Sequence, residues 1–137
     1  MKHLLKIDHI GYAVYSIEET SKHYVGAGWK MSDIYEENVQ HARIAFLTKE
    51  GSPTIELVSS LFDGDNLSPV KNILKDRGVS PYHICYEVED IMHAVEDLYD
   101  EGFRPLFMPV ESVAMENRKI CYLYHSEVGT IELVESI

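Results

Sequence analysis

Two histidine–glutamate pairs stand at matching places in a chain that repeats itself. The motif HIxYxVxxI begins at His9 and again at His83, and the motif TIELV contains Glu56 and again Glu132. The offsets are 83 − 9 = 74 and 132 − 56 = 76 residues, so the two halves align with a small insertion. A pseudo-twofold pairing of such copies would bring two imidazoles and two carboxylates to one point.

Nitrogen and oxygen donors of this kind predict a metal site. His9, Glu56, His83 and Glu132 are the predicted ligands. Two carboxylates and two imidazoles suit one hard or borderline divalent ion: Zn, Ni, Co, Mn or Mg. The competing interpretation is that both glutamates face solvent on half-exposed strands and that both histidines are structural. The repetition of both residue types at nearly equal spacing favours the metal site.

The elements that position these residues follow from hydrophobic periodicity. In the first copy, alternation from Leu5 to Val14 predicts a strand, and Ser16 before two acids predicts the start of a helix. Glycines at positions 26 and 28 end that helix. Three further strands are expected over residues 29–35, 42–48 and 54–59. Strand alternation places Glu56 on the face opposite to its apolar neighbours.

The second copy repeats the pattern of strand, helix and three strands. We expect strands over residues 82–88, 103–108, 119–124 and 130–135, and a helix over 91–99 capped by Asp90. A short helix over 70–76, closed by Gly78, should link the copies. Residues 109–117 are predicted to form an irregular loop, longer than its counterpart at 36–41.

Length and composition restrict the classes of protein. A chain of 137 residues predicts one domain, with module one at about 1–60, a linker at 61–79 and module two at 80–137. The net charge of −11 argues against nucleic-acid partners. The start of the chain is too charged for a signal peptide, and no window is apolar enough for a membrane span. Cys85 and Cys121 are expected to be reduced core thiols, which favours a cytoplasmic protein.

Four segments together resemble the vicinal oxygen chelate superfamily, which includes glyoxalase I, methylmalonyl-CoA epimerase and extradiol dioxygenases. They are IDHIGYAV, IELV, YHICYEVEDI and GTIELVE, at residues 7–14, 55–58, 82–91 and 129–135. The resemblance implies an α+β fold in which two tandem βαβββ modules form a cupped, barrel-like mixed sheet around a metal site. It implies His9, Glu56, His83 and Glu132 as ligands. It also implies a homodimer.

By this resemblance the metal polarises a substrate carbonyl and stabilises an enediolate when the adjacent C–H is deprotonated. Glu132 is the expected base, with Glu56 facing it across the metal. We therefore predict a divalent-metal-dependent lyase or isomerase of the glyoxalase type, similar to lactoylglutathione lyase. The alternatives are a methylmalonyl-CoA epimerase-like racemase, a non-haem iron dioxygenase, and a non-catalytic protein that binds a small molecule or antibiotic. A fourth ligand at Glu56 disfavours the dioxygenase, and retention of all four ligand types disfavours the binding protein.

The epimerase pattern breaks at one position. That family carries a catalytic glutamate in a segment sixteen residues before the second ligand, and the residue here is Gln40. An amide cannot take a proton at neutral pH, so a two-base epimerisation would need His41 as a substitute. A solvated loop histidine is the competing interpretation for His41.

The substrate is expected to be a small molecule: a thioester, a hemithioacetal or a hydroxy-keto acid. Arg43 and Arg118 are predicted to hold a substrate carboxylate or phosphate, and Gln40 to contact the substrate. Arg118 and Lys119 enter a strand together, so one of the two should point toward the site. A solvated strand edge is the alternative for both.

Overall fold

The computed structural model describes residues 1–4, 6–38 and 40–137, and its elements form two copies of one pattern. The first copy is β1 (Lys6–Ala13), α1 (Ile17–Gly26), β2 (Lys30–Met31), β3 (Tyr35–Glu37), β4 (Ala42–Thr48) and β5 (Ile55–Ser60). The linking helix α2 (Lys71–Arg77) follows. The second copy is β6 (Ser80–Val88), α3 (Ile91–Asp100), β7 (Arg104–Pro105), β8 (Val110–Ser112), the 3-10 helix η1 (Val113–Met115), β9 (Arg118–His125) and β10 (Gly129–Glu135). The predicted α+β class with two βαβββ-like modules is confirmed.

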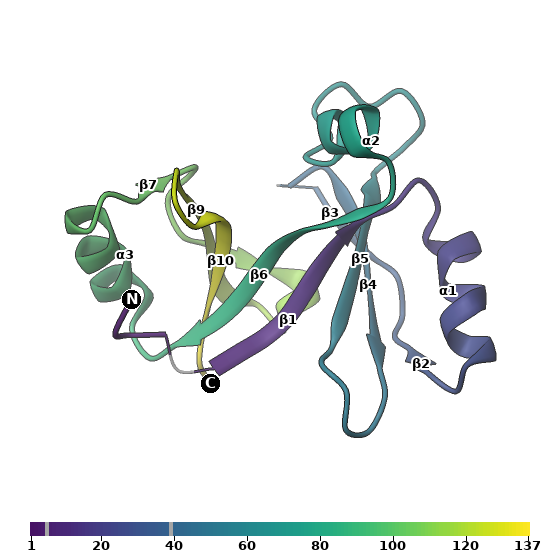
Figure 1. Cartoon of the computed structure of the whole chain (residues 1–137), viewed down its shortest axis with the longest axis horizontal. Helices are drawn as coiled ribbons and strands as arrows, with labels where there is room; N and C mark the ends of the chain where they lie inside the picture. Colours follow the sequence, from purple (N-terminus) through teal and green to yellow (C-terminus); the bar gives the residue numbers. More distant parts are fainter. Residues whose placement is uncertain (5, 39) are drawn as a thin grey trace. The chain divides into compact units, whose positions relative to one another are not determined.

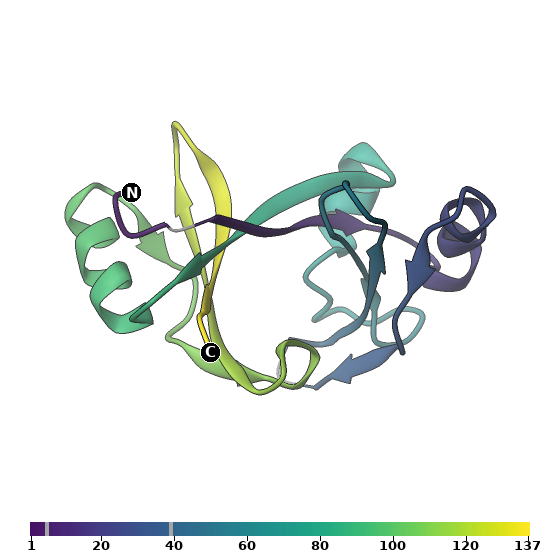
Figure 2. The same cartoon turned by 90° about the horizontal axis from the view of Figure 1, so that it is seen from below.

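The chain divides into two compact units. One, here called the central unit, is Ile10–Tyr82. The other, here called the terminal unit, combines Met1–His9 with His83–Ile137 and contains both ends of the chain. Each unit is a sheet with one helix packed on it: α1 lies against β4 and β5 in the central unit, and α3 lies against β9 and β10 in the terminal unit (Figures 1 and 2).

The central unit has the strand order β2-β4-β5-β1, with β3 also paired to β4. β1 and β5 are parallel, and Gly11 is the partner of Glu56. β4 and β5 are antiparallel, and Phe46 is the other partner of Glu56. The Glu56 side chain lies on one face of this sheet. The other face packs on α1 through a buried cluster: Val14, Ile17, Ala45, Leu47 and Leu57.

The terminal unit repeats this construction with the order β6-β10-β9-β7, and β8 also pairs with β9. β6 and β10 are parallel, so that Glu132 lies beside Cys85. β9 and β10 are antiparallel, so that Glu132 also lies beside Tyr122. The other face packs on α3 through a second cluster, which includes Val88, Ile91, Leu98, Phe103, Leu123 and Leu133. Both sheets are therefore mixed, and in both the glutamate faces away from the helix.

Both helices begin where their capping residues predict. The Ser16 hydroxyl accepts a hydrogen bond from the Glu19 amide at 3.1 Å, and the Asp90 carboxylate accepts one from the His93 amide at 3.0 Å. Each side chain satisfies a backbone donor that the first helical turn leaves open. α3 ends before Gly102, whose φ is +99°. A Cβ at that position would lie 3.2 Å from the His125 ring, so glycine is needed both for its φ and for space.

Two connections differ from the expected ones. Residues 109–117 are not one irregular loop, because β8 and η1 lie within them. β8 is a strand of three residues that pairs antiparallel with β9 across η1, and three residues are too few for hydrophobic alternation to indicate a strand. The single strand expected over 29–35 is two shorter ones, β2 and β3, which both pair with β4.

The strand expected over 103–108 is shorter, because β7 ends at Pro105. The other strand boundaries lie within two residues of those expected, although Leu5, the first residue of the first predicted strand, is outside the described residues. Cys85 and Cys121 are buried free thiols, as predicted. Among the described residues, no helix has both the length and the apolar character needed to cross a bilayer.

Candidate metal centre

Three of the four predicted ligands meet inside the terminal unit. His9 is the last residue of β1 that belongs to this unit. His83 is on β6, and Glu132 is on β10. Register explains why two of them share a face: Glu132 pairs with Cys85, which is two residues from His83 along β6. All three side chains are buried, with exposed fractions of 0%, 3% and 2% respectively.

The donor atoms of this cluster are close enough to bind one ion. Nε2 of His9 and Nε2 of His83 lie 3.0 Å and 3.2 Å from Oε1 of Glu132, and the two nitrogens are 3.3 Å apart. Donors bound to one metal at about 2.1 Å are separated by roughly 3.0 Å in octahedral and roughly 3.4 Å in tetrahedral geometry. The cluster therefore fits a small divalent cation held by two imidazoles and one carboxylate.

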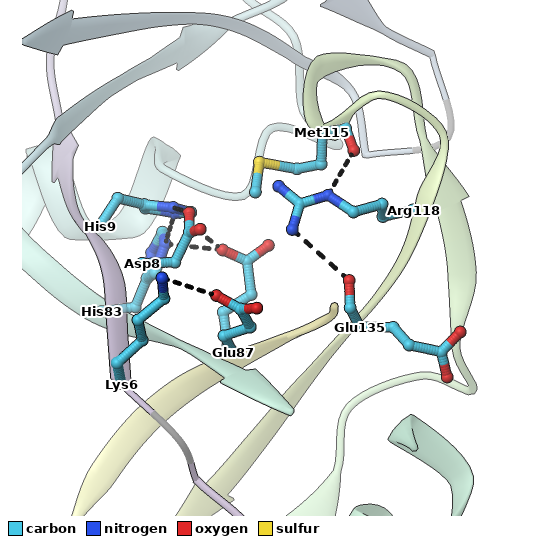
Figure 3. Close-up of polar contacts among 9 residues, drawn as sticks. Lys6, Asp8, His9, His83, Glu87, Met115, Arg118 and Glu135 are labelled. Atoms are coloured by element: carbon cyan, nitrogen blue, oxygen red, sulfur yellow. Dashed lines mark hydrogen bonds and ion pairs between the residues drawn. The ribbon is translucent and has the colours of Figure 1, made fainter. Parts of the chain in front are cut away.

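Asp8 orients the first of these ligands. Its Oδ2 lies 2.8 Å from Nδ1 of His9 (Figure 3), whereas the other ring nitrogen, Nε2, faces Glu132. A carboxylate at Nδ1 favours the tautomer that carries its proton there, which leaves the lone pair of Nε2 for a metal. The repeat did not indicate this residue, because the second copy has Tyr82 in the corresponding place. Its signal was its position directly before a predicted ligand.

Cys85 lies beside the cluster but is poorly suited to act as a thiolate. Burial raises the pKa of this thiol well above its ordinary value, and the nearby negative charge of Glu132 raises it further. The thiol is then neutral at pH 7, and the donor set stays nitrogen and oxygen. Such a set favours Zn, Ni, Co, Mn or Mg over ions that need sulfur ligands.

Tyr122 forms the wall next to His83. The two rings meet edge to face with centroids 5.2 Å apart, and Phe107 meets the other side of Tyr122 at 5.6 Å. The aromatic contacts fix the plane of the His83 ring and surround the donors with apolar surface. Low local polarity strengthens the attraction of the carboxylate for a cation.

Glu56 occupies the matching position in the central unit. It lies on β5 between Gly11 of β1 and Phe46 of β4, and its side chain is buried, with 2% exposed. Its face of the sheet is the one that α1 does not cover. A buried carboxylate is costly unless it is paired or bound to a metal, so its placement agrees with the ligand role predicted for it.

The sequence also matches a described family. A sequence profile of the glyoxalase/bleomycin resistance protein/dioxygenase superfamily covers residues 8–122. The chain belongs to this superfamily. Its vicinal oxygen chelate resemblance, predicted from the repeated motifs, is thereby confirmed.

Similar proteins within the superfamily carry a specific activity in their names. An ethylmalonyl-CoA/methylmalonyl-CoA epimerase of Cereibacter sphaeroides is 27% identical over 121 residues, which are 87% of either chain. The methylmalonyl-CoA epimerase of Mycobacterium tuberculosis has the same fold, with a TM-score of 0.84 over 98% of this chain and 90% of that chain, at 24% identity. A Streptomyces coelicolor methylmalonyl-CoA epimerase variant in complex with 2-nitronate-propionyl-CoA has a TM-score of 0.80 at 26% identity, over 97% of this chain and 98% of that chain.

Gln40 and His41, where this superfamily member departs from the epimerase pattern, lie in the turn before β4. His41 has a left-handed backbone, with φ at 52°, and its Nδ1 lies 3.2 Å from Oδ2 of Asp65. Asp65 is buried while His41 is half-buried. An imidazole held by a carboxylate is oriented for proton transfer, so the predicted catalytic role of His41 stays a prediction with this contact in its favour.

Glu37, at the end of β3, is a buried carboxylate that sequence reasoning missed. Register places it on the same face as Glu56, because it pairs with Ala42, and Ala42 pairs with Ser60. Ser60 is four residues from Glu56, or about 13 Å along the strand. Glu37 is therefore a second buried carboxylate on the face of the sheet that carries Glu56.

Arg43 lies on the face of β4 that α1 covers. Its partner in β5 is Ser59, so its side chain points away from Glu56. Its guanidinium donates to both carboxylate oxygens of Glu18 at 3.2 Å and 3.0 Å, and this pairing lowers the pKa of Glu18. Arg43 also lines an open cavity of about 340 Å³ with Lys71 and Lys75. The substrate-binding role of Arg43 stays a prediction. Its pairing with Glu18, on the face away from Glu56, does not support that role.

Arg118 lies on the same face of β9 as Tyr122, whereas Lys119 points to the opposite face. Its Nε donates to the Met115 carbonyl at 3.1 Å and a terminal nitrogen approaches the Glu135 carbonyl at 3.5 Å (Figure 3). The two carbonyls hold the guanidinium in place. The backbones of Arg118 and Tyr122, four residues apart on β9, are separated by about 13 Å. A substrate contact by Arg118 stays a prediction.

Proposed function

We propose that this protein is a metal-dependent epimerase that inverts the carbon next to the thioester carbonyl of a branched acyl-CoA such as methylmalonyl-CoA. Its relatives named above are methylmalonyl-CoA epimerases, and one is bound to an acyl-CoA analogue. This similarity favours the epimerase alternative over the glyoxalase-type activity that we predicted from the sequence.

The observation that carries the proposal is the convergence of His9, His83 and Glu132 in a buried cluster. We propose Glu56 as the fourth ligand, because it repeats Glu132 in the duplicated sequence. A divalent cation at this position would polarise a substrate carbonyl and so acidify the neighbouring C–H bond. The two imidazoles, as neutral ligands, preserve the positive charge that this polarisation needs.

Glu132 is the proposed base. Its carboxylate takes the proton from the carbon next to the carbonyl, the C–H bond breaks, and the electron pair moves into the carbonyl group. Inversion then requires a proton delivered to the opposite face of that carbon. Glu56 is the first candidate for this acid, and His41, paired to Asp65, is the second.

Solvent-exchange kinetics test the proposal. Enzyme with single-enantiomer methylmalonyl-CoA in D₂O should give the other enantiomer with deuterium at the inverted carbon, measured by chiral separation and mass spectrometry. Glu132→Gln should lower this rate by at least about a hundredfold, while the exposed-turn variant Glu127→Gln keeps it. Full activity in Glu132→Gln would remove Glu132 from the mechanism.

Gln40 specifically favours a second function, glyoxalase-like isomerisation, since that reaction needs no acid at this position. The same preparations should therefore be given the hemithioacetal of methylglyoxal and glutathione. Turnover of the hemithioacetal without exchange on methylmalonyl-CoA would select the glyoxalase function. A different outcome would be that His41→Ala abolishes epimerisation and that adding Gln40→Glu to this variant restores it. His41 would then be the group that replaces the glutamate of the epimerase pattern.

Metal content is a separate test. We expect about one ion per chain at this centre in protein purified without chelator, measured by elemental analysis. His83→Ala should lose that ion. Equal metal content in His83→Ala and wild type would show that the ligand assignment is wrong, whatever the reaction.

A further inference from the structure

A second group of metal-ligand side chains lies in the terminal unit and shares no residue with the buried centre. It consists of His3, in the segment before β1, with His93 and Asp97 of α3. Each offers one ligand atom, and the three atoms lie within 4.8 Å of one another. His93 and Asp97 are four residues apart, which puts them on one face of the helix.

The contacts within this group already hold it together. His3 Nε2 is hydrogen-bonded to Oδ2 of Asp97, and this contact lowers the pKa of Asp97. Nε2 of His93 lies 3.8 Å from the same oxygen. The two imidazole rings are 4.8 Å apart at their centroids. The half-buried His3 and the exposed His93 therefore both present Nε2 to the same oxygen of Asp97.

The surroundings favour a cation with open coordination positions. A cavity of about 170 Å³ lined by Lys2, His3, Glu89, Asp90 and His93 adjoins the group. The His93 side chain is 60% exposed, so water can complete the coordination. The cavity lining contains two carboxylates and one lysine, and the whole chain carries a net charge of −11. Both the local and the overall negative charge attract a cation.

We propose that His3, His93 and Asp97 form a second divalent-metal site, of the zinc type, in addition to the buried centre. Two imidazoles, one carboxylate and water are a donor set that Zn²⁺ takes readily at tetrahedral geometry. The ion would fasten the segment before β1 to α3. That segment also places Leu4 against the core cluster under α3, so the ion would reinforce a contact that the fold already makes.

Zinc stoichiometry tests this proposal independently of the reaction. Chelator-stripped protein titrated with Zn²⁺, followed by calorimetry and elemental analysis, should bind one equivalent more than the buried centre accounts for. His93→Ala should lose one equivalent. His23→Ala, which removes an exposed histidine from the last turn of α1, should lose none.

The His83→Ala variant separates the two sites. Because it lacks a ligand of the buried centre only, it should still bind one Zn²⁺, and the double variant His83→Ala/His93→Ala should bind none. Zn²⁺ should also slow hydrogen exchange of the amides at residues 2–4 in wild type and in His83→Ala, but not in His93→Ala. An unchanged stoichiometry in His93→Ala, or no protection of that segment, would overturn the site while leaving the proposed function untouched.

Discussion

Asp8 shows how much a metal ligand depends on the residue beside it. His9 can present Nε2 to a metal only if its other nitrogen keeps the proton, and the carboxylate 2.8 Å from Nδ1 favours that tautomer. Asp8→Asn should therefore weaken metal affinity by about ten- to a hundredfold, the usual effect of losing such a partner. A competition titration with a chromophoric chelator measures it.

The matched control for this variant is Asp33→Asn, an exposed aspartate of the central unit. Its metal affinity should equal that of wild type, which excludes a general effect of removing one negative charge. Wild-type affinity in Asp8→Asn would mean that Asp8 does not orient His9.

Cys121 gives the stability of the protein a predictable dependence on alkaline pH. Burial, with a further contribution from Glu132, raises its pKa from 9.0 to about 12. In the unfolded chain the thiol ionises near the lower value, so the unfolded state binds fewer protons above it. The contribution of the Cys121 thiol to the free energy of unfolding is therefore complete below pH 9.0, and it is lost as the pH rises toward about 12.

Cys121→Ala should consequently reduce this dependence. The difference in free energy of unfolding between wild type and Cys121→Ala should be largest near pH 7 and should shrink by pH 10.5, because only wild type loses the thiol contribution. Urea denaturation at both pH values measures it. A difference that grows with pH would contradict the raised pKa.

At the scale of elements, the first turns of α1 and α3 depend on their capping side chains. Ser16→Ala and Asp90→Ala each remove the acceptor for one amide in the first turn of a helix, and each should lower the free energy of unfolding by about 1 kcal/mol. Chemical denaturation measures the loss. Ser52→Ala, in the turn between β4 and β5, is the control and should change stability little; equal losses in all three variants would refute the capping role.

The strands illustrate why elements were easier to predict than their pairing. The strand-type residues over 42–48, followed by the turn signals at 50–53, predicted β4 with its observed bounds. The same local pattern could not indicate β8, because a strand of three residues is too short to show alternation. It also could not assign Arg43 to the face covered by α1, because a face depends on register.

At the scale of the whole molecule, we predict a homodimer, which rests on resemblance to superfamily members that pair through their sheets. Light scattering at micromolar concentration should give about twice the chain mass of 15.7 kDa. The measurement should be repeated after chelator treatment, to learn whether assembly needs the metal. A single species at the chain mass under both conditions would reject the dimer.

The sequence by itself determined the duplication and the two modules, and it nominated four ligands that stay a prediction, because a repeated His and Glu in repeated strands needs no knowledge of distance. Only the tertiary structure decided which other groups surround the ligands. Asp8, Cys85 and Tyr122 reach the cluster through strand register and side-chain direction, and Arg43 is turned away from Glu56 by the same register. The grouping of His3 with His93 and Asp97 likewise joins residues about ninety positions apart, a proximity that no local pattern carries.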